Sequence, residues 1–167
     1  VEVKVVKDDG SEAACREVGE LIVRGPNVML GYYGLPDESA EALKDGWLYT
    51  GDLAYRDEEG YIFIVDRKKD IIIVSGLNVY PREVEEILYQ YPAVKEAAVI
   101  GKPDKKRGEI VCAYVVVKEG QKLNKKDLIV FLKANLASYK LPREIIEMEA
   151  LPKNATGKIL KKELREF

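Results

Sequence analysis

The apolar residues of this 167-residue chain come in short runs, and this pattern limits the folds open to it more than any other feature. The longest run, Ile110 to Val117, is far shorter than the ~20 residues that a membrane-spanning helix needs. Turn-forming stretches such as Asp8-Asp9-Gly10 and Asp57 to Gly60 separate the runs, as is typical of β-strands. We therefore expect a strand-rich α+β protein without a transmembrane segment.

The composition excludes several kinds of function. The chain has 27 Lys+Arg and 29 Asp+Glu, and the resulting net charge of -2 argues against nucleic-acid binding and against a polybasic membrane-surface binder. It has no histidine, so Ser-His-Asp and Cys-His catalysis and histidine-based zinc sites are excluded within it. The two cysteines, Cys15 and Cys112, fit neither a structural zinc site nor a disulfide framework and indicate a reducing compartment. We expect no metal site in these residues.

The first part of the chain, residues 1–68, predicts short strands around one short helix. The helix, Glu38 to Lys44, is expected to end at the stop signal Asp45-Gly46. The expected strands are Val1 to Val6, Glu20 to Arg24, Trp47 to Arg56 and Gly60 to Asp66.

The second part of the chain predicts a small α+β domain with the order β-α-β-β-α-β and a terminal helix. The charged stretch Arg67 to Asp70 marks the boundary between the two parts, unless it is only a solvated turn. The expected elements are a strand at Asp70 to Val74, a helix at Pro81 to Gln90, strands at Val94 to Gly101 and Glu109 to Lys118, a helix from Leu123-Asn124 to Leu136, a strand at Arg143 to Glu149, and a helix after the loop Leu151 to Gly157.

The loop Pro152 to Lys158 is the first candidate site. A phosphate-binding P-loop is excluded, because Pro152 stands where its spacing needs Gly and Ile159 stands where it needs Ser or Thr. A loop lysine such as Lys158 can still bring a point charge to a phosphate or carboxylate. The alternative is that Lys158 is one more solvated lysine.

Two further segments carry candidate ligand-binding residues. Asp52, in Tyr49-Thr50-Gly51-Asp52, has two oxygens that can accept the hydroxyls of a ribose, although Gly-Asp is also ordinary turn chemistry. In the stretch Asp66 to Glu85, Arg67 could bind a sugar or phosphate, and Gly76 could let a ligand approach the backbone closely. The alternative for this stretch is a strand, a turn and a helix with ordinary punctuation.

Taken together and in this order, these segments resemble the closing motifs of adenylate-forming enzymes, the ANL superfamily. The resemblance covers nearly the whole chain. Within the superfamily, the stretch Ser75 to Glu85 is most similar to that of fatty-acyl-CoA synthetases. Ile73 stands where some members, including luciferases, have a lysine, which argues against a bioluminescent use. The matching motifs are Gly19-Glu20-Leu21, Thr50-Gly51-Asp52, Asp66 to Glu85 and Asn154 to Lys158.

The resemblance implies a division into two domains. Residues 1–68 would be the end of a large N-terminal AMP-binding domain, as part of a distorted β-barrel subdomain. Residues 69–167 would be the C-terminal lid domain. The chain starts at Val1, and its only methionines are Met29 and Met148, so we expect it to be a fragment of a longer enzyme.

The resemblance also implies an acid–thiol ligase that uses ATP, Mg²⁺ and CoA. The resemblance favours a fatty acid as the carboxylic acid, which would form an acyl-adenylate and then a thioester. The phosphate loop, the magnesium motif and the acyl pocket would all lie in the N-terminal domain. We expect the fragment alone to be inactive and to bind no cofactor tightly. The implied site residues are Lys158 for catalysis, Asp52 and Arg67 for the nucleotide, Lys69 as the hinge, and Ser75, Gly76 and Leu77 for the pantetheine channel.

Other readings stay open from sequence. The enzyme could act on an aryl acid or load a carrier protein, and a non-catalytic binding module of the same fold is the rival from another class. The lysines at 102, 105 and 106 and Arg107 could meet the CoA phosphates or be a solvated loop. We expect a cytoplasmic location, with peripheral membrane association of the full-length enzyme as an alternative.

Overall fold

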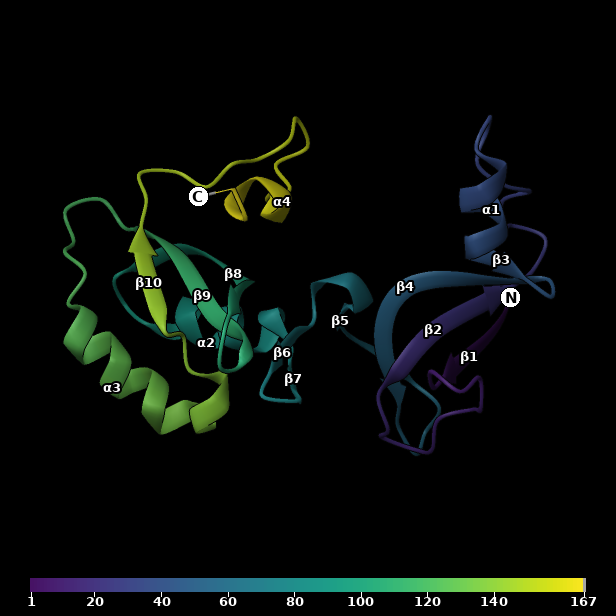
Figure 1. Ribbon diagram of the computed structural model, residues 1–167, viewed down its shortest axis with the longest axis horizontal. Helices are drawn as coiled ribbons and strands as arrows, with labels where there is room; N and C mark the ends of the chain where they lie inside the picture. Colours follow the sequence, from purple (N-terminus) through teal and green to yellow (C-terminus); the bar gives the residue numbers. More distant parts are fainter. Residues whose placement is uncertain (167) are drawn as a thin grey trace. The chain divides into compact units, whose positions relative to one another are not determined.

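The structure of the protein is a computed structural model, and it describes residues 1–166 (Figure 1). The chain forms two compact units, which divide between Lys69 and Asp70. We call residues 1–69 the first unit and the residues from Asp70 onward the second unit. No helix of the described residues is long and apolar enough to cross a membrane.

The first unit is a curled five-stranded sheet with one helix (Figure 1). Its strands are paired in the order β1-β2-β4-β3, and β5 pairs with β4; all pairs are antiparallel. The elements are β1 (Glu2–Val6), β2 (Gly19–Arg24), α1 (Pro36–Ala42), β3 (Leu43–Lys44), β4 (Trp47–Arg56) and β5 (Ile62–Arg67).

The expected helix over Glu38 to Lys44 is wrong at its end. Leu43 and Lys44 instead pair with β4 as the short strand β3. Asp45 and Gly46 have φ angles of 51° and 79°, which are typical of the two-residue turn that joins a tight hairpin. The Asp-Gly pair therefore acts as a hairpin turn here, and the helix stops before it.

The core of the first unit is small. Val5, Ala13 and Ala54 form a buried cluster, against which Leu21 and Ile62 pack. Many large apolar side chains stay exposed, among them Leu30, Tyr32, Tyr33, Leu35, Tyr61, Phe63 and Ile64. The sheet of this unit thus leaves apolar surface uncovered.

The second unit is an α+β domain built on another five-stranded sheet (Figure 1). Its strands are paired in the order β10-β9-β6-β7, and β8 pairs with β9. β10 runs parallel to β9, and the other pairs are antiparallel. The elements are β6 (Ile72–Val74), β7 (Leu77–Val79), α2 (Pro81–Gln90), β8 (Val94–Asp104), β9 (Gly108–Val117), α3 (Lys125–Asn135), β10 (Glu144–Glu147) and α4 (Lys161–Leu164), with short 3₁₀ helices at Lys68–Asp70 and Ser138–Lys140.

Side chains of β9 alternate between two separate cores. Val111, Ala113 and Val115 pack with α2 and α3 on one face of the sheet. Cys112, Tyr114 and Val116 pack on the other face with Leu151 and Leu164 from the C-terminal segment. This alternation is the two-residue period of a β-strand, and it explains why β9 reads as a continuous apolar run.

The α+β class expected from sequence is confirmed, and the boundaries of several elements differ. β7 was not expected, and Asp70 lies in the 3₁₀ helix rather than in β6. The loop expected over Lys102 to Gly108 is shorter, because β8 continues to Asp104 and β9 begins at Gly108. Helix α3 begins after Asn124, whose side chain accepts hydrogen bonds from Lys126 N and Asp127 N and so caps the helix.

Candidate functional site

Asp52 and Arg67 lie opposite each other on neighbouring strands of the first unit. Asp52 is in β4, Arg67 ends β5, and the two residues are partners in the strand register. The Nε atom of Arg67 lies 2.7 Å from Oδ1 of Asp52, and their side chains are 49% and 26% exposed. The structure therefore brings these two predicted site residues together as an accessible ion pair whose charges balance.

The backbone around Asp52 is fixed by polar contacts from Thr50 and Glu20. The Thr50 hydroxyl donates to Leu21 O at 2.8 Å and accepts a hydrogen bond from Asp52 N at 3.1 Å. Gly51 has a φ of 72°, which favours glycine, and its N–H donates to Glu20 Oε1 at 3.3 Å. These contacts hold the backbone at Asp52 in position, at a bulge between β2 and β4.

Lys68 is a structural residue that sequence reasoning missed. Its ammonium lies 2.8 Å from Asp8 Oδ1 and 3.0 Å from Glu20 Oε2. Hydrogen bonds to these two carboxylates raise the pKa of Lys68 above its ordinary value. Glu20 thus joins the Thr50-Gly51-Asp52 turn to the residue before Lys69. The Gly19-Glu20-Leu21 motif pointed to Glu20 in the sequence, but nothing in the sequence pointed to its ion pair with Lys68.

Lys69, the predicted hinge residue, lies at the division between the two units. It is in the 3₁₀ helix Lys68–Asp70, and its exposed side chain has no partner among residues 1–166. Its two neighbours are both held, Lys68 as described above and Asp70 by Arg165 at 3.0 Å. Lys69 thus has no side-chain partner among residues 1–166, whereas the residues on either side of it form ion pairs.

Ser75 and Gly76 form the turn of the β6–β7 hairpin. Their φ angles of 51° and 82°, together with the pairing of Val74 with Leu77, define a two-residue turn. Ser75 N donates to Arg107 O at 2.7 Å, which ties the turn to the β8–β9 connection. Leu77, expected in a loop, is instead the first residue of β7, and its side chain is about half exposed. A role of these residues in a pantetheine channel stays a prediction.

The loop that carries Lys158 is a tight hairpin. Asn154 Oδ1 accepts hydrogen bonds from Thr156 N at 3.1 Å, from Thr156 Oγ1 at 2.8 Å and from Lys158 N at 2.9 Å. Asn154 N donates to Lys158 O at 3.0 Å, and Gly157 has a φ of 82°. These contacts define one shape for the loop, and glycine suits the backbone conformation at its turn.

The side chain of Lys158 is exposed and has no partner among residues 1–166, unlike two lysines near it. Lys153 Nζ lies 2.8 Å from a carboxylate oxygen of Glu96, and Lys161 Nζ lies 2.8 Å from Glu85 Oε1. Sequence reasoning missed both carboxylates, since neither pair is close in sequence. The two ion pairs hold the chain on either side of Lys158 and leave its ammonium available to a ligand.

Neither a reactive cysteine at Cys112 nor a group of metal ligands adds a candidate site among residues 1–166. Burial raises the pKa of the Cys112 thiol to about 11, so the group is a poor nucleophile near neutral pH. Among residues 1–166, no group of three or more Cys, Asp or Glu side chains could hold a metal ion.

Comparison with known proteins places the chain in a family. Residues 83–158 match the AMP-binding enzyme C-terminal domain. The chain is 52% identical to a long-chain-fatty-acid–CoA ligase of Bacillus subtilis, over 96% of the chain and 29% of that protein. It is 48% identical to the fatty acid–[acyl-carrier-protein] ligase ScoC of Streptomyces coeruleorubidus, over 99% of the chain and 32% of that protein.

Solved structures give the same result. The o-succinylbenzoate CoA synthetase MenE of Bacillus subtilis, in complex with its acyl-adenylate intermediate, superposes with a TM-score of 0.92 at 40% identity, over 98% of this chain and 33% of that one. The same synthetase in complex with ATP and magnesium gives a TM-score of 0.88.

The chain therefore belongs to the adenylate-forming enzymes, as the resemblance implied, and it corresponds to the C-terminal part of such an enzyme. Its closely similar relatives include enzymes named long-chain-fatty-acid–CoA ligases. The chain spans about a third of the length of the relatives that it matches.

Proposed function

We propose that the chain is part of an AMP-forming fatty-acid–CoA ligase and supplies the catalytic lysine of its first reaction step. The observation that carries this proposal is the free ammonium of Lys158 on a hydrogen-bonded loop between two ion-paired lysines. The similarity to a long-chain-fatty-acid–CoA ligase supports the substrate class. Fatty-acid activation would place the enzyme in lipid metabolism.

In the first step, a carboxylate oxygen of the acid attacks the α-phosphorus of ATP, and pyrophosphate leaves with the electrons of the broken P–O bond. Negative charge builds on the oxygens of the pentavalent phosphorus, so a positioned cation stabilises the transition state. Lys158 would supply this charge as a compact ammonium. The resemblance implies that the residues that bind the Mg²⁺ accompanying ATP lie in the N-terminal domain of the enzyme.

The Asp52–Arg67 pair would bind the ribose of the nucleotide. A carboxylate accepts hydrogen bonds from two adjacent hydroxyls, and the guanidinium of Arg67 has further N–H donors beyond the Nε that meets Asp52. The contacts from Thr50 and Glu20 would keep this geometry during turnover.

In the second step, the thiol of CoA attacks the acyl carbon of the acyl-adenylate and AMP leaves. Residues 1–68 would belong to the large AMP-binding domain and residues 69–167 to a lid that turns about Lys69 between the steps. The turn at Ser75 and Gly76, with Leu77, would then line the path of the pantetheine arm. We further propose a cytoplasmic enzyme, since both cysteines are free.

A carrier-protein thiol is the second candidate acceptor in place of CoA. The similarity to a fatty acid–[acyl-carrier-protein] ligase favours this acceptor. For the acid substrate, the alternative to a fatty acid is an aryl acid. Supplying CoA and a pantetheinylated carrier protein in parallel to the intact enzyme, with each class of acid, distinguishes these alternatives by the thioester formed.

The main test is Lys158→Ala in the intact enzyme. We expect the rate of adenylation, measured as ATP–pyrophosphate exchange, to fall by about two to four orders of magnitude. Thioester formation from supplied acyl-adenylate should fall far less. Lys162→Ala removes another exposed cation from the same segment and is the matched control. Equal loss in both half-reactions would contradict the assignment.

Two further outcomes follow from the same proposal. The polypeptide of residues 1–167 should make no acyl-adenylate from ATP and a fatty acid, and detectable product would overturn that expectation.

Lys69→Pro in the intact enzyme should slow mainly the thiol step, because proline restricts the backbone at the proposed hinge. Unchanged thioester formation would count against a hinge at Lys69.

A further inference from the structure

The unpaired edge of strand β8 receives a carboxylate from helix α2. In the described part of the chain, β8 pairs with β9 alone, so its other edge has no strand partner. The N–H of Val99 on this edge donates to Oε1 of Glu85 at 2.7 Å. A backbone donor that would otherwise lack a partner in the fold is thereby satisfied.

The same oxygen of Glu85 binds the first residue of α4. Lys161 Nζ lies 2.8 Å from Glu85 Oε1, and the two side chains are only 20% and 16% exposed. Helix α2 packs on one face of the sheet, whereas Leu151 and Leu164, on either side of Lys158 in the sequence, are buried on the other. Glu85 therefore connects α2, the edge of β8 and the segment that carries Lys158.

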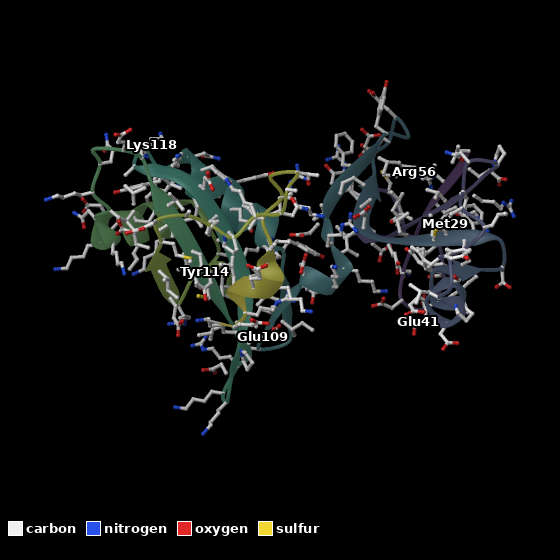
Figure 2. The ribbon with its side chains drawn as sticks, turned by 90° about the horizontal axis from the view of Figure 1, so that it is seen from above. Met29, Glu41, Arg56, Glu109, Tyr114 and Lys118 are labelled. Atoms are coloured by element: carbon white, nitrogen blue, oxygen red, sulfur yellow. The ribbon has the colours of Figure 1, made fainter. Side chains whose placement is uncertain are left out.

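Other contacts fix the same segment but reach it elsewhere. The hydroxyl of Tyr114, which is labelled in Figure 2, donates to Leu164 O at 2.9 Å. The ion pair of Lys153 with Glu96 holds the chain before the loop. Backbone bonds such as Leu160 N to Pro152 O, at 2.8 Å, close the hairpin itself. Of these contacts, the Glu85–Lys161 pair anchors the start of α4, which follows Lys158 in the chain, and both of its side chains are largely shielded from water.

We infer that Glu85 is a positioning residue for Lys158, acting through Lys161. This inference rests on the proposed function, because it assigns Glu85 to the step in which Lys158 acts. Without the carboxylate, Lys161 loses its anchor, and the end of the hairpin after Lys158 can move relative to the sheet. A misplacement of about 1 Å can cost about 100-fold in rate when a catalytic group must meet a transition state.

The inference predicts a selective defect. Lys158 is proposed to act in adenylation and not in the thiol step, so a loss of its position should slow only the first step. A merely structural role of Glu85 would lower both rates through loss of folded protein. The ratio of the two half-reaction rates therefore separates positioning from general destabilisation.

The experiment uses Glu85→Gln and Lys161→Met in the intact enzyme, with ATP–pyrophosphate exchange and thioester formation from supplied acyl-adenylate as the two assays. We expect each variant to lower the kcat of adenylation by about 10- to 100-fold, with the thiol step within about threefold of the unmodified enzyme. The double variant should be no slower than the slower single variant, because both changes break one interaction. Lys161→Arg keeps the charge and should restore most of the rate.

Glu83→Gln is the matched control. Glu83 lies on the same helix and forms an ion pair with Lys140 at 2.6 Å, but it does not contact the segment around Lys158. An equal loss in both half-reactions, an equal selective loss in Glu83→Gln, or additive losses in the double variant would overturn the inference. If Lys158→Ala slows adenylation and Lys161→Met does not, only this inference fails. If Lys158→Ala has no effect, the proposed function fails as well.

Discussion

The two units differ in how completely their sheets are covered. In the second unit, helices cover one face of the sheet and the C-terminal segment covers the other, so that residues such as Leu88 and Leu164 are fully buried. The first unit has a small core, and Tyr33, Phe63 and Ile64 remain exposed on it. Burial of apolar surface is the dominant stabilising contribution to a fold, so the second unit has the means to fold alone and the first does not.

The units also differ in how they treat their candidate site residues. Asp52 and Arg67 in the first unit neutralise each other, whereas Lys158 in the second unit has no partner within residues 1–166. A neutralised pair suits the binding of a hydroxyl-rich group such as ribose, since no net charge must be desolvated. A free ammonium suits a transient charge that appears only during reaction. The following predictions test these contrasts, beginning with the largest effect.

The largest expected effect concerns the two units made separately. Residues 70–167 should unfold in a cooperative thermal transition, and residues 1–69 should show none, because too little apolar surface is buried to offset chain entropy. Circular dichroism during heating measures both. A cooperative transition in residues 1–69 would break the contrast between the units.

The next effect concerns one large apolar residue in each unit, tested in the polypeptide of residues 1–167. Leu88→Ala leaves a cavity in a filled core and should lower the free energy of unfolding by about 3 kcal/mol. Ile64→Ala removes a side chain that is 44% exposed and should cost less than about 1 kcal/mol. Denaturant titration compares the two. A larger cost for Ile64→Ala in the intact enzyme would indicate that other parts of the enzyme cover this residue.

A third prediction compares the two free cysteines, of which Cys15 is exposed and Cys112 is buried. With its pKa raised to about 11, Cys112 has a thiolate fraction of only about one in a thousand at pH 8. We expect a thiol reagent to label Cys15 at once and Cys112 at least ~100-fold more slowly, since the thiolate is the reacting form.

The pH dependence of this labelling has a fixed sign. Because the pKa is raised, the thiolate fraction of Cys112 in the folded protein should grow as the pH rises toward 11. Cys15→Ser isolates the signal of Cys112, and unfolding in guanidinium should make that thiol fully reactive. Rapid labelling of folded Cys15→Ser protein at pH 8 would contradict the burial of Cys112.

The smallest expected effect concerns the proposed ribose-binding residues of the first unit. Asp52→Asn in the intact enzyme should weaken ATP binding by about tenfold, since it removes charge from hydrogen bonds to the ribose. Its effect on the adenylation rate at saturating ATP should be far smaller than that of Lys158→Ala. Asp57→Asn changes a turn-capping carboxylate in the same hairpin and serves as the control. A tenfold loss in the control would assign the effect to the turn instead.

The sequence predicted those helices and strands whose positions depend on residues close together in the chain. Asn124 marked the start of α3, and the alternation of apolar residues marked the main strands. Strand β7 was missed because it is only three residues long and follows a two-residue turn at Ser75 and Gly76, which resembles a loop in sequence. Strand β8 was extended through polar residues because pairing with β9 outweighed their low strand propensity.

For the candidate site, the sequence indicated candidate residues but not the residues that they contact. The motifs indicated Asp52, Arg67 and Lys158, and the register of β4 and β5 then placed the first two in contact. The pairs of Lys161 with Glu85 and of Lys68 with Glu20 join segments far apart in the chain. Such contacts depend on tertiary packing, which no local pattern encodes.

The carboxylate at the edge of β8 also bears on solubility. A long strand with an unpaired edge can template pairing with another chain and so begin aggregation. At Val99, this edge is capped by the side chain of Glu85, and at Glu96 it carries an ion pair with Lys153. A backbone N–H that is already bound to a carboxylate is not available to the carbonyl oxygen of an incoming strand at that position. The contacts that hold the loop of Lys158 thus also block part of this edge against self-association.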